Sequence, residues 1–135
     1  MTTLDQAQQA INDRFIAAWG STTPFSFTNE MPASNDISTS WVRLVSRLAV
    51  SGQRSLGQSG NRKYDRNGII FVQVFSPINQ GSSSGTALAK QIEDLYEGER
   101  FNGVVGQDSI IRDIGPDGEW YQLQVEINFT YEEIK

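Results

Sequence analysis

Apolar residues in the first twenty positions recur at steps of three and four, the period of a helix with one buried face. Thr2 or Thr3 can cap the start of this helix, Asp5 suits its first turn, and Gly20 can end it. The pattern therefore predicts an amphipathic helix. The residues of its apolar stripe are Leu4, Ala7, Ile11, Phe15, Ala18 and Trp19.

The middle of the chain changes to a period of two. After a polar stretch from Ser21 to Ser40, with at most a short strand at Phe25 and Phe27, apolar residues alternate from Trp41 to Val50. Val42, Leu44, Leu48 and Val50 share one face of this predicted strand, and Arg43 and Arg47 share the other.

A second strand is predicted from Ile69 to Ser76, where both faces are apolar. Such a strand is central and covered on both sides, either by helices or by a neighbouring subunit. Between the two strands, Ser51 to Gly68 is polar, basic and interrupted by glycines. We predict that this segment is a long, mobile loop that projects from the strand pair.

The second half of the chain repeats the helix-then-strands order. A flexible turn from Ser76 to Gly85 leads into a predicted helix from Thr86 to Glu97, which Gly98 closes. Two strands follow, and the turn Gly115–Gly118 joins them. Their ranges are Ser109–Ile114 and Glu119–Tyr131, and the last alternates an apolar face (Tyr121, Leu123, Val125, Ile127, Phe129, Tyr131) with a polar one (Gln122, Gln124, Glu126, Asn128, Thr130).

This order of elements predicts the fold class. A chain of 135 residues is the length of one domain with a single core. We expect residues 1–135 to form one α+β domain, in which two α-helices pack on one face of a mainly antiparallel β-sheet.

The composition removes most catalytic chemistries, because the chain contains no His and no Cys. A Ser-His-Asp triad, a His-based metal site, a thiolate nucleophile and a disulfide framework are all excluded. The first ten residues lack the basic start and apolar run of a signal peptide. The densest apolar run, Gly68–Phe75, is far shorter than the ~20 residues of a membrane helix, so we expect a soluble protein made in the cytoplasm, with no membrane partner.

Two motifs with possible chemistry are weak. The loop Gly81–Thr86 before the second helix has no Lys after its last glycine, and Lys90 lies a turn further on, so a capping turn is favoured over phosphate binding. Carboxylates gather at one turn and near the end of the chain, but nothing predicts the cleft of a glycosidase or the ligand spacing of a calcium loop. We expect no enzyme activity, cofactor or metal; those carboxylates are Asp113, Asp117, Glu119, Glu132 and Glu133.

Charge is strongly segregated along the chain. Residues 41–68 hold six bases against one acid, a net +5, whereas residues 93–135 hold three bases against eleven acids, a net −8. Two solvated surfaces would explain this, and so would a nucleic-acid groove, although the overall charge of −5 opposes the latter. A third explanation is head-to-tail contact between copies, the mode that closes rings.

Several segments, in order, resemble one protein family. The run Arg62–Pro77, with the sequence RKYDRNGIIFVQVFSP, resembles the central strand of the tail-terminator proteins of long-tailed bacteriophages. The similarity continues through Gly85–Lys90, Asp94–Gly98 and the turn Ile114–Gln122, and the segment Phe15–Trp19 is similar to the family's first helix. It therefore spans nearly the whole chain.

The resemblance implies a structural role in the virion. Such proteins form a hexameric ring at the head-proximal end of the tail tube, stop tube polymerisation, and provide the surface that joins the tail to the head. The implied partners are further copies of the chain, the tail tube protein and the head–tail connector or stopper. Genomic DNA would pass through the lumen without specific binding, which suits the excess of acidic residues.

Charge and resemblance together indicate interface residues. We expect a set of basic residues to meet an acidic surface on a neighbouring subunit or on the tube protein, with a set of acidic residues as candidate complements. The bases are Arg54, Arg62, Lys63 and Arg66, and the acids are Glu97, Glu99, Glu132 and Glu133.

Two alternatives remain open. One is another neck protein of the same particle, such as a head-side stopper or a tube relative. The other is a small carbohydrate-binding module or carboxylate hydrolase, in which Trp41, Trp120 and Tyr121 would form a sugar platform. Burial in a core or interface is the favoured interpretation of those aromatic residues.

Overall fold

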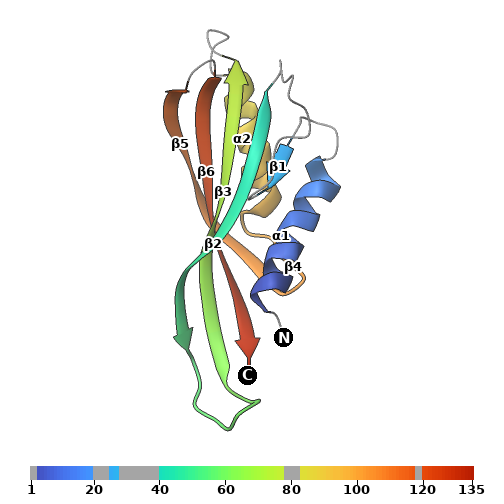
Figure 1. Cartoon of the computed structure of the whole chain (residues 1–135), viewed down its shortest axis with the longest axis vertical. Helices are drawn as coiled ribbons and strands as arrows, with labels where there is room; N and C mark the ends of the chain where they lie inside the picture. The colour runs from blue at the N-terminus through green and yellow to red at the C-terminus, as the bar shows by residue number, and fades with distance from the viewer. Residues whose placement is uncertain (1–2, 20–24, 28–39, 78–82, 118–119) are drawn as a thin grey trace.

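The computed structural model describes residues 3–19, 25–27, 40–77, 83–117 and 120–135. Two helices and six strands follow one another in these described ranges (Figure 1). In order they are α1 (Leu4–Trp19), β1 (Phe25–Phe27), β2 (Trp41–Gln53), β3 (Lys63–Pro77), α2 (Ser83–Tyr96), β4 (Arg100–Phe101), β5 (Val104–Asp117) and β6 (Trp120–Ile134).

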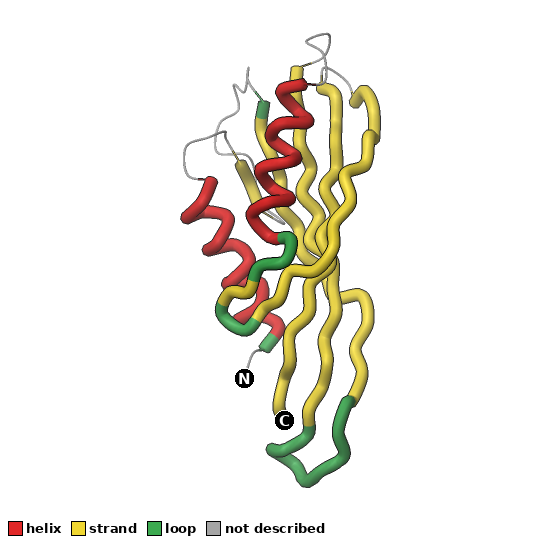
Figure 2. Tube along the Cα trace, turned by 180° about the vertical axis from the view of Figure 1, so that it is seen from behind, coloured by secondary structure: helices red, strands yellow, loops and turns green. Residues whose placement is uncertain are grey.

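All six strands belong to one sheet with the order β1-β2-β3-β6-β5-β4. Only the short pairing of β1 with β2 is parallel, and the other ladders are antiparallel. Both helices lie on the same side of this sheet, as Figure 2 shows from behind. The predicted α+β class is therefore confirmed, with a mainly antiparallel sheet and two helices on one face.

The core lies between the helices and the sheet. Phe15 of α1 and Ile92 and Tyr96 of α2 are fully buried against the apolar faces of β2, β3 and β6. The buried phenol of Tyr96 donates to the Ile11 carbonyl at 2.7 Å and so ties α2 to α1. The alternation predicted for the last strand is confirmed, because its apolar face supplies five buried core residues: Leu123, Val125, Ile127, Phe129 and Tyr131.

The predicted start of the first helix is confirmed at Thr3. The Ala7 amide donates to the Thr3 carbonyl at 2.9 Å, and the Thr3 amide donates back to the Gln6 side chain at 3.1 Å. The second bond is one half of a capping box, whereas the Thr3 hydroxyl donates to the Asp5 carboxylate instead of accepting from the Gln6 amide. Gly20, the predicted end, lies outside the described residues.

Several predicted element bounds are wrong, including the ends of β5 and β6, which continue to Asp117 and Ile134. The second helix begins at Ser83 rather than Thr86. The strand predicted from Ser109 begins at Val104, after a hairpin from β4 whose two turn residues, Asn102 and Gly103, both have positive φ. Positive φ at both positions is the geometry of the tightest hairpins, and the Asn-Gly pair favours it.

A further correction concerns the loop predicted from Ser51 to Gly68. β2 continues to Gln53 and β3 begins at Lys63, so only residues 54–62 connect the strands. The ladder persists because β3 pairs with β6 on its other side as far as Lys63 and Ile134. Backbone hydrogen bonds to two neighbours therefore order a segment whose polar side chains alone predict a loop.

Candidate assembly surfaces

The most prominent feature is a ribbon that we call the arm, residues 48–68. It consists of the end of β2, the connection 54–62 and the start of β3. Figure 1 shows that the arm, together with the end of β6, extends along the long axis past the N-terminal end of α1. The arm carries all four basic residues predicted to lie at an interface.

Two of those bases form ion pairs within the chain. Arg54 lies 3.6 Å from Asp65 and makes a close ion pair with Glu132. Arg66 lies 3.2 Å from Glu133 in a pair whose side chains are only 16% and 17% exposed. The structure thus brings together two predicted bases and two predicted acids, but inside one chain.

Backbone hydrogen bonds hold the end of the arm against β6. The amide of Arg62 donates to the Lys135 carbonyl at 3.1 Å, and the amide of Lys135 donates to the Arg62 carbonyl at 2.9 Å. Across the connection, the Arg54 amide donates to the Lys63 carbonyl at 2.7 Å. The arm and the end of β6 therefore form a three-stranded extension of the sheet with a short connecting tip, and not an eighteen-residue loop.

The tip presents an apolar side chain beside two free bases. Leu56 is 93% exposed, and Val50, nearer the base of the arm, is 64% exposed. Among the described residues, neither Arg62 nor Lys63 has a carboxylate within 4.0 Å. The nearly complete exposure of Leu56 makes the tip a candidate contact site.

The two remaining predicted acids lie elsewhere, after the end of α2. Glu97 accepts a close hydrogen bond from the Ser109 hydroxyl. Glu99 lies 3.8 Å from Arg14 of α1. No ion pair or hydrogen bond between described residues joins either acid to the arm.

A groove lies beside Glu99, and sequence analysis did not predict it. Its volume is about 460 Å³, and three alanines of α1, the end of α2 and the β4–β5 turn form its walls. Arg14 is fixed along it, because its Nε donates to the Leu95 carbonyl at 2.8 Å and its guanidinium stacks over Phe101 at 5.0 Å. The lining residues are Ala10, Asp13, Arg14, Ala17, Ala18, Leu95, Phe101 and Asn102.

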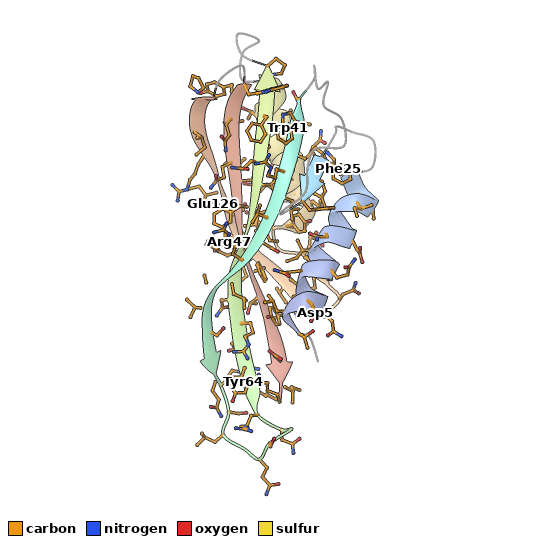
Figure 3. The ribbon with its side chains drawn as sticks, in the orientation of Figure 1. Asp5, Phe25, Trp41, Arg47, Tyr64 and Glu126 are labelled. Atoms are coloured by element: carbon orange, nitrogen blue, oxygen red, sulfur yellow. The ribbon has the colours of Figure 1, made fainter. Side chains whose placement is uncertain are left out.

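The sheet face turned away from the helices carries two of the three predicted aromatic residues, Trp41 and Trp120. Trp41 stacks on Phe75 with ring centroids 4.3 Å apart, and Trp120 meets its edge at 6.4 Å (Figure 3 labels Trp41). Trp41 is only 8% exposed, and Tyr121 points to the opposite face from Trp120 because it is the next residue in the strand. The three residues therefore form no common sugar platform, and the favoured prediction of burial is confirmed for Trp41.

The same face has a shallow hollow of about 380 Å³ further along β2. Half-buried Val45 and Phe71 form its apolar part. Its remaining lining residues are Arg43, Arg47, Gln73 and Gln124.

Among the described residues, the predicted carboxylates do not gather into a catalytic pair. Glu132 and Glu133 are consecutive in β6, point to opposite faces, and each has its own arginine partner. Asp113 accepts a hydrogen bond from the Tyr121 hydroxyl at 2.6 Å, which raises the pKa of Tyr121. The side chains of Asp117 and Glu119 lie outside the described residues.

Other candidate chemistry is similarly sparse. The loop Gly81–Thr86 lies partly outside the described residues, and Lys90 pairs with Glu93 at 3.2 Å and Asp94 at 3.0 Å. These hydrogen bonds, led by that with Asp94, raise the pKa of Lys90. Within the ranges that the structure describes, no three acidic side chains could share a metal ion, and no helix is long and apolar enough to cross a membrane.

Comparisons with known proteins identify the fold. No protein-family model and no curated protein sequence matches the chain. A solved structure whose name carries no functional description matches with a TM-score of 0.69 over 100% of this chain and 99% of its own. Its sequence is 15% identical, so this likeness shows a shared fold alone.

Proposed function

We propose that this chain is a structural virion protein that forms a ring at the head-proximal end of a phage tail tube. In that position the ring stops tube polymerisation and provides the surface that joins the tail to the head. The observation that carries the proposal is the arm, an ordered ribbon that leaves the domain and exposes Leu56 and Lys63 beside the half-buried Arg62. An isolated domain gains nothing from such a projection, whereas an assembly subunit gains a contact site.

The resemblance to tail terminators supports the same role. The run Arg62–Pro77 that carries it forms the arm's second strand and the central strand of the sheet. The turn segment Ile114–Gln122 leads from β5 into β6, the neighbour of that strand. One resembling segment thus supplies the second strand of the arm, and the turn segment lies at the other end of the same β3–β6 ladder.

The ion pairs divide the predicted interface residues into two roles. Arg54 and Arg66 position the arm, because their guanidinium groups are engaged by Glu132 and Glu133. Arg62 and Lys63 are the bases that remain for an acidic surface on a neighbouring subunit or on the tube protein. Contact through them should weaken with salt, since exposed charges are screened over about 8 Å at physiological ionic strength.

Electron microscopy of particles that lack this chain tests the role directly. Without a terminator, tube protein continues to polymerise, so we expect overlong tails without heads, and supplying the chain in trans should restore normal length. Tails of normal length that still fail to join heads would refute termination and indicate a neck protein instead. Tails of normal length joined to heads would refute both roles.

Native mass spectrometry tests the ring itself. A sixfold particle, alone or on tube ends, is expected, whereas a twelvefold particle would point to a connector. Reversing both free bases, with Arg62→Glu and Lys63→Glu, should reduce assembly. The matched control is Arg47→Glu with Lys90→Glu, which makes the same change in net charge at two positions outside the arm. Equal assembly by both double variants would show that the arm's bases make no contact.

A further inference from the structure

We infer that the tip of the arm docks into the groove between α1, α2 and the β4–β5 turn of the next copy, with Leu56 as its anchor. This inference specifies which surfaces meet between neighbouring copies in the proposed ring. It depends on the proposed function only for the number of copies. The contact joins two different surfaces of the same chain, so it is head-to-tail.

The tip behaves as a pre-formed ligand. Leu56 is the most exposed large apolar side chain of the described residues, at 93%. The strands behind it are held by the Arg62–Lys135 backbone pair and by the ion pairs of Arg54. Docking an already ordered segment avoids most of the entropy cost of fixing a flexible loop.

The groove has the shape and chemistry to receive an aliphatic side chain. Leu95 and Phe101 supply half-buried apolar surface, and Ala17 and Ala18 are too small to fill the space above it. A volume of about 460 Å³ lies within the range of pockets that bind ligands. Small side chains also let the backbone of an incoming ribbon approach closely.

The charges around tip and groove are complementary. Lys63 and Arg62 border the tip and have no carboxylate partner among the described residues. At the groove, Asp13 accepts a hydrogen bond from the neutral Gln9 amide at 2.7 Å and has no cation within 4.0 Å in the described part of the chain. Glu99 is 52% exposed and only loosely paired with Arg14 at 3.8 Å. Arg14 also lines the groove and offsets part of this negative charge, so the match to the bases of the tip rests on Asp13 and the loosely paired Glu99.

A copy cannot place its own tip in its own groove. The ladders of β2, β3 and β6 keep the arm along the long axis. Figure 3 shows Tyr64 on the arm beyond the end of α1 that Asp5 marks, whereas the groove begins further along α1, at Ala10. Each copy therefore offers one tip and one groove to different neighbours, and repetition of this contact closes a ring or continues as a filament.

Cysteine cross-linking tests the contact, because the chain has no Cys of its own. A mixture of Leu56→Cys chains with Ala17→Cys chains should oxidise to a covalent heterodimer. Docked thiols experience a millimolar effective concentration, so at micromolar protein we expect formation about tenfold or more faster than in the control mixture. The control pairs Leu56→Cys with Ile16→Cys, which is similarly exposed on α1 but lies outside the groove. Equal rates in the two mixtures would overturn the inference.

A mixing experiment without cross-links gives a second readout. Leu56→Glu removes the tip but keeps the groove, and Ala17→Arg blocks the groove but keeps the tip. Neither variant should assemble alone, and the mixture should stop at dimers, because only one good contact remains. Rings formed by both single variants would refute the docking while leaving the proposed ring intact. The opposite outcome is also informative. If the specific cross-link forms but particles that lack the chain have normal tails, the terminator role is refuted and the docking still holds.

Discussion

Gly106 lies where β5 crosses the end of α2, and replacing it with alanine should be severely destabilising. A Cβ at this position would be 1.8 Å from the Tyr96 carbonyl oxygen and 2.9 Å from its carbon. Real Cβ atoms essentially never approach another atom closer than 3.0 Å, so the backbone must move. The φ angle of Gly106 is not positive, and close approach alone therefore requires the glycine.

The cost can be estimated from what that movement breaks. The Gly106 amide donates to the Glu99 carbonyl at 2.8 Å, and its carbonyl accepts from the Gly98 amide at 3.1 Å. Each hydrogen bond contributes about 1 kcal/mol net, and displacing the Tyr96 backbone also disturbs a fully buried side chain, at roughly 1–3 kcal/mol. Alanine also restricts the unfolded chain more than glycine does, but this stabilises the folded state by only about 0.4–1 kcal/mol. We expect Gly106→Ala to lower the free energy of unfolding by about 2–4 kcal/mol.

Urea unfolding followed by circular dichroism measures this difference, with Gly52→Ala as the matched control. Gly52 also lies in a strand, but a Cβ there would have no atom within 4 Å. The control should therefore unfold at the same urea concentration or a slightly higher one. A Gly106→Ala protein with the midpoint of the control would show that β5 and α2 do not approach as closely as described.

Two further predictions concern polar contacts. Burial raises the pKa of Tyr96 above its ordinary value near 10, so the stability that its neutral phenol contributes is full below pH 10 and is lost as the pH rises further. Tyr96→Phe should lower the free energy of unfolding by about 1–2 kcal/mol at pH 7, because the hydrogen bond to Ile11 is lost. The variant should also lose less stability than the parent protein at alkaline pH in thermal unfolding, and an equal alkaline loss would contradict this reasoning. The ion pair of Arg66 with Glu133 is mostly buried, so the two side chains should stabilise the fold together. A double-mutant cycle with Arg66→Met and Glu133→Gln should give a coupling energy of about 1 kcal/mol in urea unfolding. A coupling energy near zero would mean that the pair does not hold the arm.

Elements with a strong local period could be predicted from the sequence. The first helix and the last strand each bury one face. Apolar residues therefore recur every three or four positions in the helix and at every second position in the strand. The β4–β5 hairpin could also have been found, because Asn102-Gly103 is a strong short-range turn signal. It was missed because β4 contains only two residues and shows no period of its own.

The arm could not be predicted from local pattern. Its strands are polar, and the partner that orders them, β6, begins more than fifty residues after the arm ends. The same holds for the candidate site: the sequence supplies the charged residues, but Arg54 and Glu132 are 78 positions apart, and only the register shows that they meet. The groove combines α1 with a turn about ninety residues later, so no sequence window contains it.

The position of β6 has a consequence for how the protein is made. This strand follows every other strand in the sequence, yet it lies between β3 and β5 inside the sheet. During synthesis, residues before Trp120 can form the β2–β3 hairpin and the helices but cannot close the sheet or fix the end of the arm. Folding must wait for these late, non-local pairings, which makes it slow. A nascent chain therefore lacks a fixed arm until β6 has left the ribosome.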